Sequence, residues 1–208
     1  MRSAVLFLVF NRPDTTAQVF EAIRAAKPPR LYIAADGPRL GKPDEGRRCA
    51  EVREIAMRVN WPCEVRTLFR ERNLGCKMAV SEGIRWFFEA EEEGIILEDD
   101  VLPLQSFFRY CDELLERYRK DERVGLISGC NLIMRQYTPQ DSYFFSTYNH
   151  IWGWASWRRA WKHYDTAMKD WPNWRDQGGL SKISNGNARF QRYWRMTFDK
   201  VFAGKIDT

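Results

Sequence analysis

The 208-residue sequence predicts an α/β protein with a mostly parallel central sheet that is flanked by helices. Short apolar segments alternate with segments whose apolar residues recur at helical spacing, from the start of the chain to about residue 131. Polar or turn-forming residues follow each apolar segment. We therefore expect a single domain over residues 1–208, with an α/β half at 1–131 and a Trp-rich C-terminal elaboration at 132–208.

Five strands are predicted, each a short run of apolar or alternating residues, with a helical pattern in each interval between them. The first helix is expected to open at a capping box, Thr15-Thr16-Ala17-Gln18, after Pro13 and Asp14 have ended the first strand. The predicted strands are Val5–Phe10, Leu31–Ala35, Cys63–Phe69, Gly94–Leu97 and Val124–Ile127.

The alternation stops near residue 132, and fewer elements are predicted beyond it. Tyr143–Tyr148 is a candidate for one more strand, residues 156–164 for a short helix, and Asn187–Phe202 for a longer helix.

Composition and charge exclude several classes of function. Five cysteines without a C-x-x-C pair, and only two histidines, exclude zinc-finger, thioredoxin-like and three-histidine metal sites. No apolar run approaches the roughly 20 residues that span a bilayer, and no secretory signal is recognised, so we expect a cytoplasmic protein with reduced thiols. P-loop, dinucleotide-binding and G-x-S-x-G motifs are absent.

The charge is unevenly distributed. The net charge is +5, yet residues 151–208 hold 11 of the 33 Lys and Arg, only 5 of the 28 Asp and Glu, and seven of the nine Trp. A basic and aromatic end predicts an anionic or sugar-like partner. We expect no nucleic acid, because the sequence has no Lys/Arg run and no recognisable binding motif.

Ligands bind at the carboxyl ends of the strands in open α/β sheets, so the residues after each predicted strand are candidates for function. Asn11 and Arg12 follow the first strand and form either a helix-entry loop or a contact with a phosphate or base. Asp36 follows the second, either as a turn residue or as a partner of a base or ribose. Lys77, in the first turn of the third helix, is either a solvated lysine or a partner of an anion. Other strand ends supply Arg70, Arg72, Asn73, Cys130 and Asn131.

The acidic triplet Glu98-Asp99-Asp100 after the fourth strand is the most distinctive feature. Adjacent carboxylates repel one another and cost stability unless something positive lies between them. Hard oxygen ligands at this density suit Mg²⁺ or Mn²⁺, which keep open positions for phosphate oxygens. The alternative is an acidic surface turn. The preceding strand favours the metal, because it places the triplet at the ligand-binding edge.

Trp152-Gly153-Trp154 is a candidate for sugar binding, because indole faces stack on sugar rings and glycine permits close backbone approach. The alternative is a small satellite core that closes the sheet. Trp154, Trp157 and Trp161 recur at i, i+3 and i+7, a helical spacing that favours core positions for all three.

In this order, these motifs resemble bacterial GT-A-fold glycosyltransferases, members of the nucleotide-diphospho-sugar transferase superfamily related to N-acetylglucosaminyltransferase I. The resemblance covers about residues 4–164. It rests on Val5–Pro13, Ile33–Gly37, Arg72–Lys77, Ile95–Val101 and Trp152–Trp154.

The resemblance implies a role for each motif. Residues 1–131 would be the nucleotide-binding half and 132–208 the acceptor-side half. Asn11, Arg12, Asp36 and Lys77 would contact the nucleotide, with Asp36 reading the uracil. Asp100 would coordinate Mn²⁺ or Mg²⁺, and Glu98 and Asp99 would contact the ribose or sugar. Trp152, Gly153 and Trp154 would line the donor-sugar and acceptor region.

The resemblance also implies metal-dependent, inverting transfer from a nucleotide-sugar, most simply a UDP-sugar, to a glycan or lipid-linked acceptor. The basic C-terminal end would suit a phosphorylated or membrane-associated glycan, so peripheral membrane association is a further expectation. Relatives take their catalytic base from a C-terminal acidic segment. Here Asp207 is the acid nearest that end, and Asp165 and Asp170 match no motif.

Two alternatives remain open. One is a non-catalytic carbohydrate- or partner-binding module with a vestigial donor site, which the basic aromatic end would suit. The other is a sugar-phosphate nucleotidyltransferase, although such enzymes carry a Gly-rich loop after the first strand and this chain has Asn11-Arg12-Pro13-Asp14 there.

Overall fold

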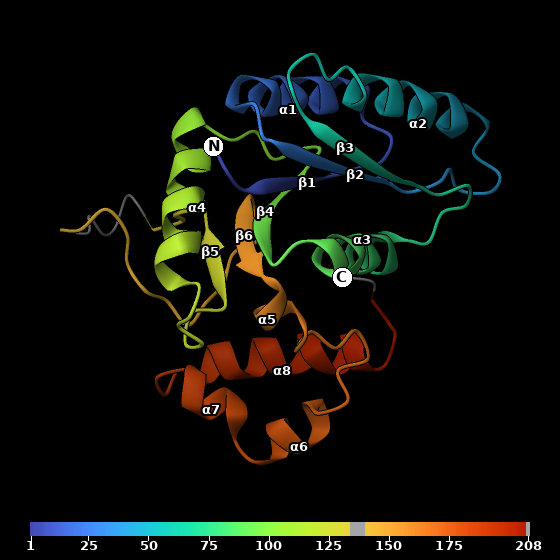
Figure 1. Cartoon of the computed structure of the whole chain (residues 1–208). Coiled ribbons are helices and arrows are strands. Elements are labelled where there is room, and N and C mark those ends of the chain that lie inside the picture. Colours follow the sequence, from blue (N-terminus) through green and yellow to red (C-terminus); the bar gives the residue numbers. More distant parts are fainter. Residues whose placement is uncertain (134–139, 207–208) are drawn as a thin grey trace. The chain divides into compact units, whose positions relative to one another are not determined.

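The computed structural model describes residues 1–133 and 140–206, and Figure 1 shows the arrangement of their helices and strands. Contacts between residues divide the chain into two compact units. The core unit comprises residues 1–74 and 78–163, and the C-terminal unit comprises residues 75–77 and the chain from Tyr164 onward.

The core unit is built on one six-stranded sheet with the order β3-β2-β1-β4-β6-β5. Strands β1, β2, β3 and β4 are mutually parallel, and β6 runs antiparallel to both of its neighbours. The predicted fold class, a mostly parallel sheet flanked by helices, is therefore confirmed. The strands are β1 (Ala4–Val9), β2 (Arg30–Ala35), β3 (Glu64–Phe69), β4 (Glu93–Glu98), β5 (Leu126–Ser128) and β6 (Trp154–Trp157).

Helices cover both faces of this sheet, because alternate residues of each buried strand point to opposite sides. Val5, Phe7 and Val9 join a cluster with α1 (Pro13–Ala26), α2 (Pro43–Ala56) and α4 (Gln105–Tyr118). Leu6 and Leu8 join the opposite cluster with α3 (Cys76–Ala90). Figure 1 shows α1 and α2 on one side of the sheet and α3 on the other.

Helix α1 begins two residues earlier than its predicted capping box. Its first residue is Pro13, and Arg12 is the N-cap residue without a side-chain cap. Proline is favoured at the first helical position because its fixed φ suits the helix and its missing N–H would have had no partner there. The hydroxyls of Thr15 and Thr16 donate to the carbonyl of Arg12 instead of capping the turn. The capping-box prediction was wrong for this reason.

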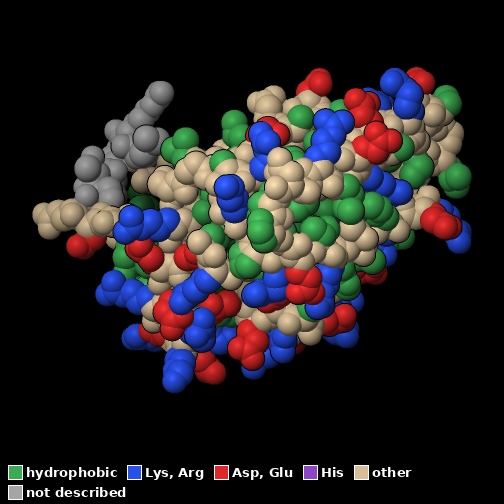
Figure 2. All heavy atoms as spheres, turned by 45° about the horizontal axis from the view of Figure 1, so that its top comes forward, with side chains coloured by type: hydrophobic (Ala, Val, Ile, Leu, Met, Phe, Trp, Pro, Cys, Tyr) green, Lys and Arg blue, Asp and Glu red, His purple; other side chains and the backbone are tan. Residues whose placement is uncertain are grey.

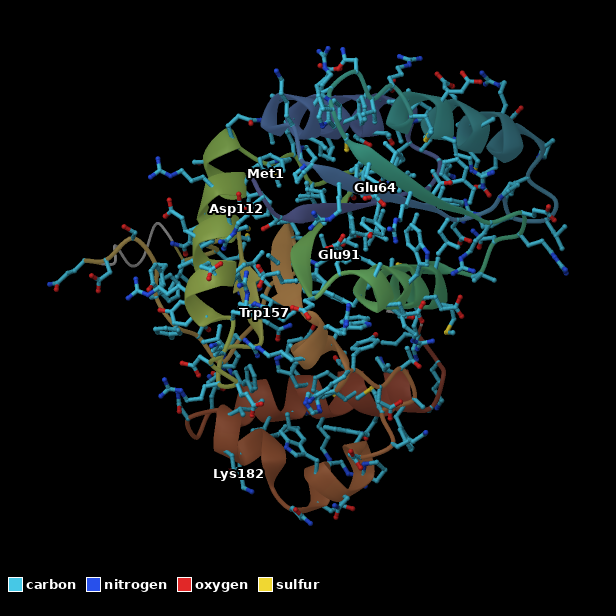
Figure 3. The ribbon with its side chains drawn as sticks, in the orientation of Figure 1. Met1, Glu64, Glu91, Asp112, Trp157 and Lys182 are labelled. Carbon is cyan, nitrogen blue, oxygen red and sulfur yellow. The ribbon has the colours of Figure 1, made fainter. Side chains whose placement is uncertain are left out.

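The sixth strand is β6 rather than Tyr143–Tyr148, which forms neither strand nor helix. Trp154 lies in the α3-side cluster and Trp157 in the α4-side cluster, as alternating strand positions require. The indole N–H of Trp157, labelled in Figure 3, donates to the carbonyl of Leu115 in α4. Trp154 and Trp157 are buried as predicted, and Trp161 is partly buried. The predicted helical pattern was wrong for Trp154–Trp157, because short apolar runs fit both periods. The predicted helix at 156–164 is reduced to α5 (Arg158–Trp161).

The residues just before β1 are bound to α4 by Asp112, which lies beside the N-terminus in Figure 3. Its carboxylate accepts the backbone N–H groups of Arg2 and Ser3, each at 3.0 Å.

On the face of the molecule in Figure 2, Lys and Arg side chains are interspersed with Asp and Glu. Among the described residues, no helix has both the length and the apolar character needed to cross a bilayer.

The described part of the C-terminal unit beyond Tyr164 contains the helices α6 (Trp171–Asp176), α7 (Gly179–Ile183) and α8 (Ala188–Phe202). The bounds of α8 match the predicted helix closely. It starts where Asn187 caps it, because the side-chain carbonyl accepts the backbone N–H of Phe190 at 3.0 Å. Trp171 of α6 packs edge-on against Phe198 of α8, with ring centroids 5.0 Å apart.

Candidate functional site

The carboxyl ends of β1, β2, β3 and β4 meet at one edge of the sheet. The chain leaves β1 toward β2 and leaves β4 toward β5, so the connections after these two adjacent strands lead toward opposite edges of the sheet. Open α/β sheets bind ligands in the crevice where the strand order reverses in this way. The residues after β1 and β4 are Phe10-Asn11-Arg12 and Asp99-Asp100.

Arg12 bridges the two aspartates that follow β4. Its Nη2 lies 3.1 Å from Oδ1 of Asp99, and its Nη1 lies 2.5 Å from Oδ2 of Asp100. The other oxygen of Asp99 accepts the backbone N–H of Phe10 at 3.0 Å. Asp99 is therefore fixed between β1 and β4, and it is only 2% exposed. The positive group that the acidic triplet was expected to need is the guanidinium of Arg12.

The three acids differ in their environments. Burial raises the pKa of Asp99, and the charge of Arg12 acts in the opposite direction. Burial also raises the pKa of Glu98, and the neighbouring Asp100 and Asp99 raise it further. Asp100 is the most accessible of the three, with 42% of its side chain exposed. Among the triplet, Asp100 is the carboxylate best placed to meet a ligand from solvent.

The carboxylates at this edge do not form a complete metal site by themselves. No group of three or more His, Cys, Asp and Glu side chains in the described residues could hold an ion by itself. Mg²⁺ is commonly bound through one or two carboxylates together with substrate phosphates, which is what Asp100 and Glu98 could offer. An ion at this edge would therefore depend on a phosphate ligand for part of its coordination.

Asp36, at the end of β2, anchors the loop that follows β3. Its carboxylate accepts the side-chain amide of Asn73 at 2.8 Å and the backbone N–H groups of Leu74 and Gly37 at 3.0 and 2.9 Å. A Cβ on Gly37 would lie 2.5 Å from the backbone of Arg72, so only glycine allows this close approach. Asp36 therefore shapes the rim of the site as well as being a candidate for contact with a nucleotide.

Asn11 is held from the other side by a residue that sequence reasoning missed. Its amide donates to Oε1 of Glu45 at 2.8 Å, and Arg39 donates backbone and side-chain N–H groups to the same carboxylate. Hydrogen bonds from Arg39 lower the pKa of Glu45 to about 2. The signal was available: Glu45 shares the buried stripe of α2 with Cys49 and Val52, at i, i+4 and i+7.

The antiparallel direction of β6 brings its first residues to the same edge. Gly153 has φ +71°, and its carbonyl accepts the backbone N–H of Gly129 after β5 at 2.8 Å. Trp152 is 57% exposed and stacks on His150, with ring centroids 6.3 Å apart. Trp154 is only 6% exposed and packs against Trp161 in the core. Of the two candidate tryptophans, only Trp152 has a ring that a ligand can reach.

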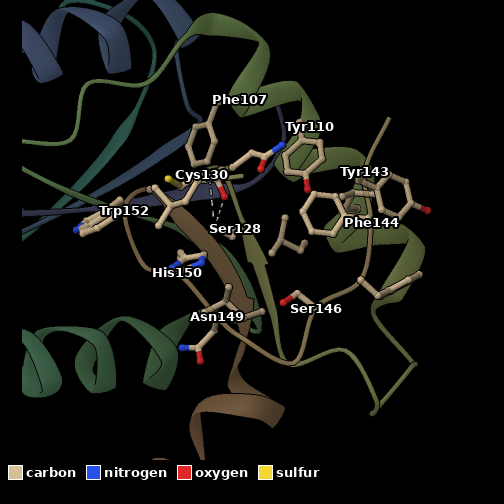
Figure 4. A pocket seen from close by; sticks show the side chains of 18 of the residues that line it. Phe107, Tyr110, Ser128, Cys130, Tyr143, Phe144, Ser146, Asn149, His150 and Trp152 are labelled. Carbon is tan, nitrogen blue, oxygen red and sulfur yellow. Dashed lines mark hydrogen bonds between the residues drawn. The ribbon is translucent and has the colours of Figure 1, made fainter. Parts of the chain in front are cut away.

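Trp152 and Gly153 also line a pocket of about 870 Å³ between α4, β5 and the segment 142–153, which Figure 4 shows from close by. Val101, the residue after Asp100, lines it as well. Most of the lining is aromatic or aliphatic, with hydroxyl and amide groups interspersed, and Arg123 is the only Lys, Arg, Asp or Glu among the lining residues that the structure describes. Pockets of this size and composition hold small organic ligands.

The roles expected of Lys77 and Asp207 stay predictions. Lys77 lies at the start of α3, is half-buried and belongs to the C-terminal unit. Asp207, the candidate base, lies outside the described residues. Asp165 accepts the backbone N–H groups of Ala167 and Lys169, so it closes a local turn.

No family model matches the chain, and no curated protein matches it. Among solved structures, it is similar to 4-diphosphocytidyl-2C-methyl-D-erythritol synthase from Anaerococcus prevotii DSM 20548, with 10% sequence identity and a TM-score of 0.42. The likeness covers 85% of this chain and 84% of that chain. Similarity at this level does not assign a function.

Proposed function

We propose that this chain is a metal-dependent glycosyltransferase that moves a sugar from a nucleoside-diphosphate sugar, in the first instance a UDP-sugar, to a glycan or lipid-linked acceptor. The observation that carries the proposal is the bridge of Arg12 to Asp99 and Asp100 at the edge where β1 and β4 end. This bridge places a cation and an accessible carboxylate side by side, as a metal-bound diphosphate requires.

The donor's diphosphate would lie over Arg12 and Asp100. A Mn²⁺ or Mg²⁺ ion held by Asp100, with Glu98 nearby, would supply Lewis-acid stabilisation of the departing nucleoside diphosphate. Arg12 offers a planar, permanently charged group that can pair with phosphate oxygens once Asp100 turns to another ligand. Asp99 stays with the backbone of Phe10 and keeps the guanidinium at this edge.

The nucleoside would lie toward β2, where Asp36 and Asn73 form the rim. The side chain of Asn11 is oriented by Glu45, which leaves its carbonyl oxygen to accept a hydrogen bond from a base or ribose. These assignments, with Lys77 as a further contact, follow the roles that the resemblance implies.

The acceptor would occupy the pocket beside Trp152. Its aromatic and hydroxyl lining suits sugar rings, which stack on apolar faces and exchange hydrogen bonds with hydroxyl and amide groups. The acceptor hydroxyl must lose a proton to a carboxylate as it attacks the anomeric carbon from the face opposite the leaving group. Asp207 is the proposed base, and the attack inverts the configuration.

Titration calorimetry with UDP tests the donor site. We expect binding in Mn²⁺, loss of binding in EDTA, and loss of the metal-dependent part in Asp100→Asn. The matched control is Asp44→Asn, an exposed aspartate in the first turn of α2, which should bind as the native chain does. Undiminished affinity of Asp100→Asn in Mn²⁺ would refute the metal assignment.

A second assay separates transfer from the alternatives. UDP released from a UDP-sugar in Mn²⁺ is expected for a glycosyltransferase. Pyrophosphate released from a nucleoside triphosphate and a sugar phosphate would identify a nucleotidyltransferase. Glycan binding with neither product would identify a binding module.

A further inference from the structure

Helix α8 presents a basic stripe that the proposed function does not use. Arg189, Arg192, Tyr193, Met196 and Lys200 recur at i, i+3, i+4, i+7 and i+11, so they share one face of the helix. All five are exposed, including two that are apolar or aromatic: Tyr193 at 63% and Met196 at 53%. The basic stripe therefore combines three cations with apolar surface that faces solvent.

The orientation of α8 within the C-terminal unit is fixed by its other side. Trp194 packs against Phe198 at 5.1 Å between ring centroids, and Phe198 contacts Trp171 of α6. Gln191 donates to the hydroxyl of Ser184 at 2.8 Å. These residues face α6 and α7, so the stripe lies on the opposite side of α8.

Asp199 is the only acidic residue of α8, and it is hydrogen-bonded and ion-paired to α6 rather than to the cations of the stripe. Asp199 accepts the indole N–H of Trp171 at 3.0 Å and pairs with Nη1 of Arg175 at 3.1 Å. The hydrogen bond from Trp171, followed by that from Arg175, lowers the pKa of Asp199. The carboxylate is thus paired with α6, and it forms no ion pair with Arg189, Arg192 or Lys200.

We propose that this stripe binds the surface of an anionic lipid bilayer. Cations near such a surface are attracted by its negative potential, and their long side chains let the charged ends stay in the headgroup region. Tyrosine is suited to the same interface because its ring is apolar and its hydroxyl is polar. A row of cations without apolar residues would be sufficient to bind a nucleic acid. The exposed Met196 between the cations favours a bilayer, because its side chain can contact acyl chains.

Co-sedimentation with vesicles tests this surface. The native chain should bind vesicles of phosphatidylcholine and phosphatidylglycerol, should not bind phosphatidylcholine alone, and should release at about 1 M NaCl, where the Debye length is about 3 Å. Neutralising the stripe with Arg189→Gln, Arg192→Gln and Lys200→Gln should weaken binding by about 100-fold, since each cation near the surface contributes severalfold.

The matched control removes the same charge elsewhere. Arg47→Gln, Arg48→Gln and Arg58→Gln neutralise three exposed cations of the core unit and should leave vesicle binding unchanged. Tyr193→Ser with Met196→Ser should weaken binding without altering its salt dependence. Circular dichroism of each variant confirms that α8 is retained.

Several results would overturn the proposal: equal loss in the stripe and control variants, equal binding to neutral vesicles, or no vesicle binding. Retention on heparin without vesicle binding would also overturn it and identify a polyanion site. None of these measurements includes a nucleotide or a metal, so their outcome is independent of the glycosyltransferase proposal.

Discussion

Arg12 and Asp99 are 87 positions apart in the sequence, yet Nη2 of Arg12 lies 3.1 Å from Oδ1 of Asp99. They meet because β1 and β4 are parallel neighbours, with Leu8 paired to Glu98, so both chains leave the sheet at the same level. The same pairing sets the N–H of Phe10 against Asp99. The carboxylate of Asp99 therefore contacts both the backbone that follows β1 and the guanidinium of the candidate site.

Replacing Arg12 should affect both stability and ligand binding. Arg12→Met leaves Asp99 buried without its cation, and we expect a loss of about 2 kcal/mol, below the usual cost for a buried pair because Arg12 is half-exposed. Urea denaturation measures the change. The double variant Arg12→Met with Asp99→Asn should regain part of the stability and still fail to bind UDP. Full UDP affinity in either variant would exclude a phosphate role for Arg12.

Gly37→Ala should destabilise the protein because the added Cβ would clash with the backbone of Arg72. The added Cβ would lie 2.5 Å from Arg72, and we expect a cost of about 2 kcal/mol together with displacement of the loop held by Asp36. Gly46→Ala in α2 is the control: its Cβ meets nothing within 4 Å, and alanine favours a helix, so stability should be equal or higher. Thermal unfolding of both variants tests this pair, and equal melting temperatures would contradict it.

The stabilisation that Glu45 contributes to the folded chain should be lost in acid. Its pKa is about 2 in the folded chain against an ordinary value of 4.5, so its stabilisation is complete above pH 4.5. The stabilisation is lost as the pH falls from 4.5 toward 2, because the unfolded chain takes up the proton first. The free energy of unfolding should therefore depend less steeply on pH in Glu45→Gln over this window. Glu51→Gln, at an exposed position of α2, should keep the native slope.

Substitutions of Trp152 and Trp154 should have different effects, although only one residue lies between them. Replacing Trp154 should lower stability, and replacing Trp152 should affect ligand binding. Trp154→Ala opens the core and should cost about 3–5 kcal/mol in urea denaturation. Trp152→Ala removes an exposed ring and should change stability by less than about 0.5 kcal/mol. Under the proposed function, Trp152→Ala should lower acceptor turnover and leave UDP affinity unchanged. A large stability loss in Trp152→Ala would show that its role is structural.

Local pattern was sufficient for the five strands and for α8. The continuous run from Val5 to Phe10 marks a strand buried on both faces, and the spacing from Phe190 to Val201 marks an amphipathic helix. Pattern failed for Trp154–Trp157, because four residues are too few to separate a period of 2 from a period of 3.6. It also misplaced the start of α1, where proline chemistry outweighed the Thr residues.

The sequence by itself determined the mostly parallel α/β architecture and the position of Glu98-Asp99-Asp100 at a strand end. Both follow from hydrophobic periodicity, which is a local property of the chain. Only the tertiary structure decided that Arg12 bridges the acids, that Asp36 holds Asn73, and that Glu45 orients Asn11. These contacts join residues that are 34 to 88 positions apart, and strand order and direction bring them together. Strand order depends on how the whole chain folds, and the pattern within one segment does not specify which strands become neighbours.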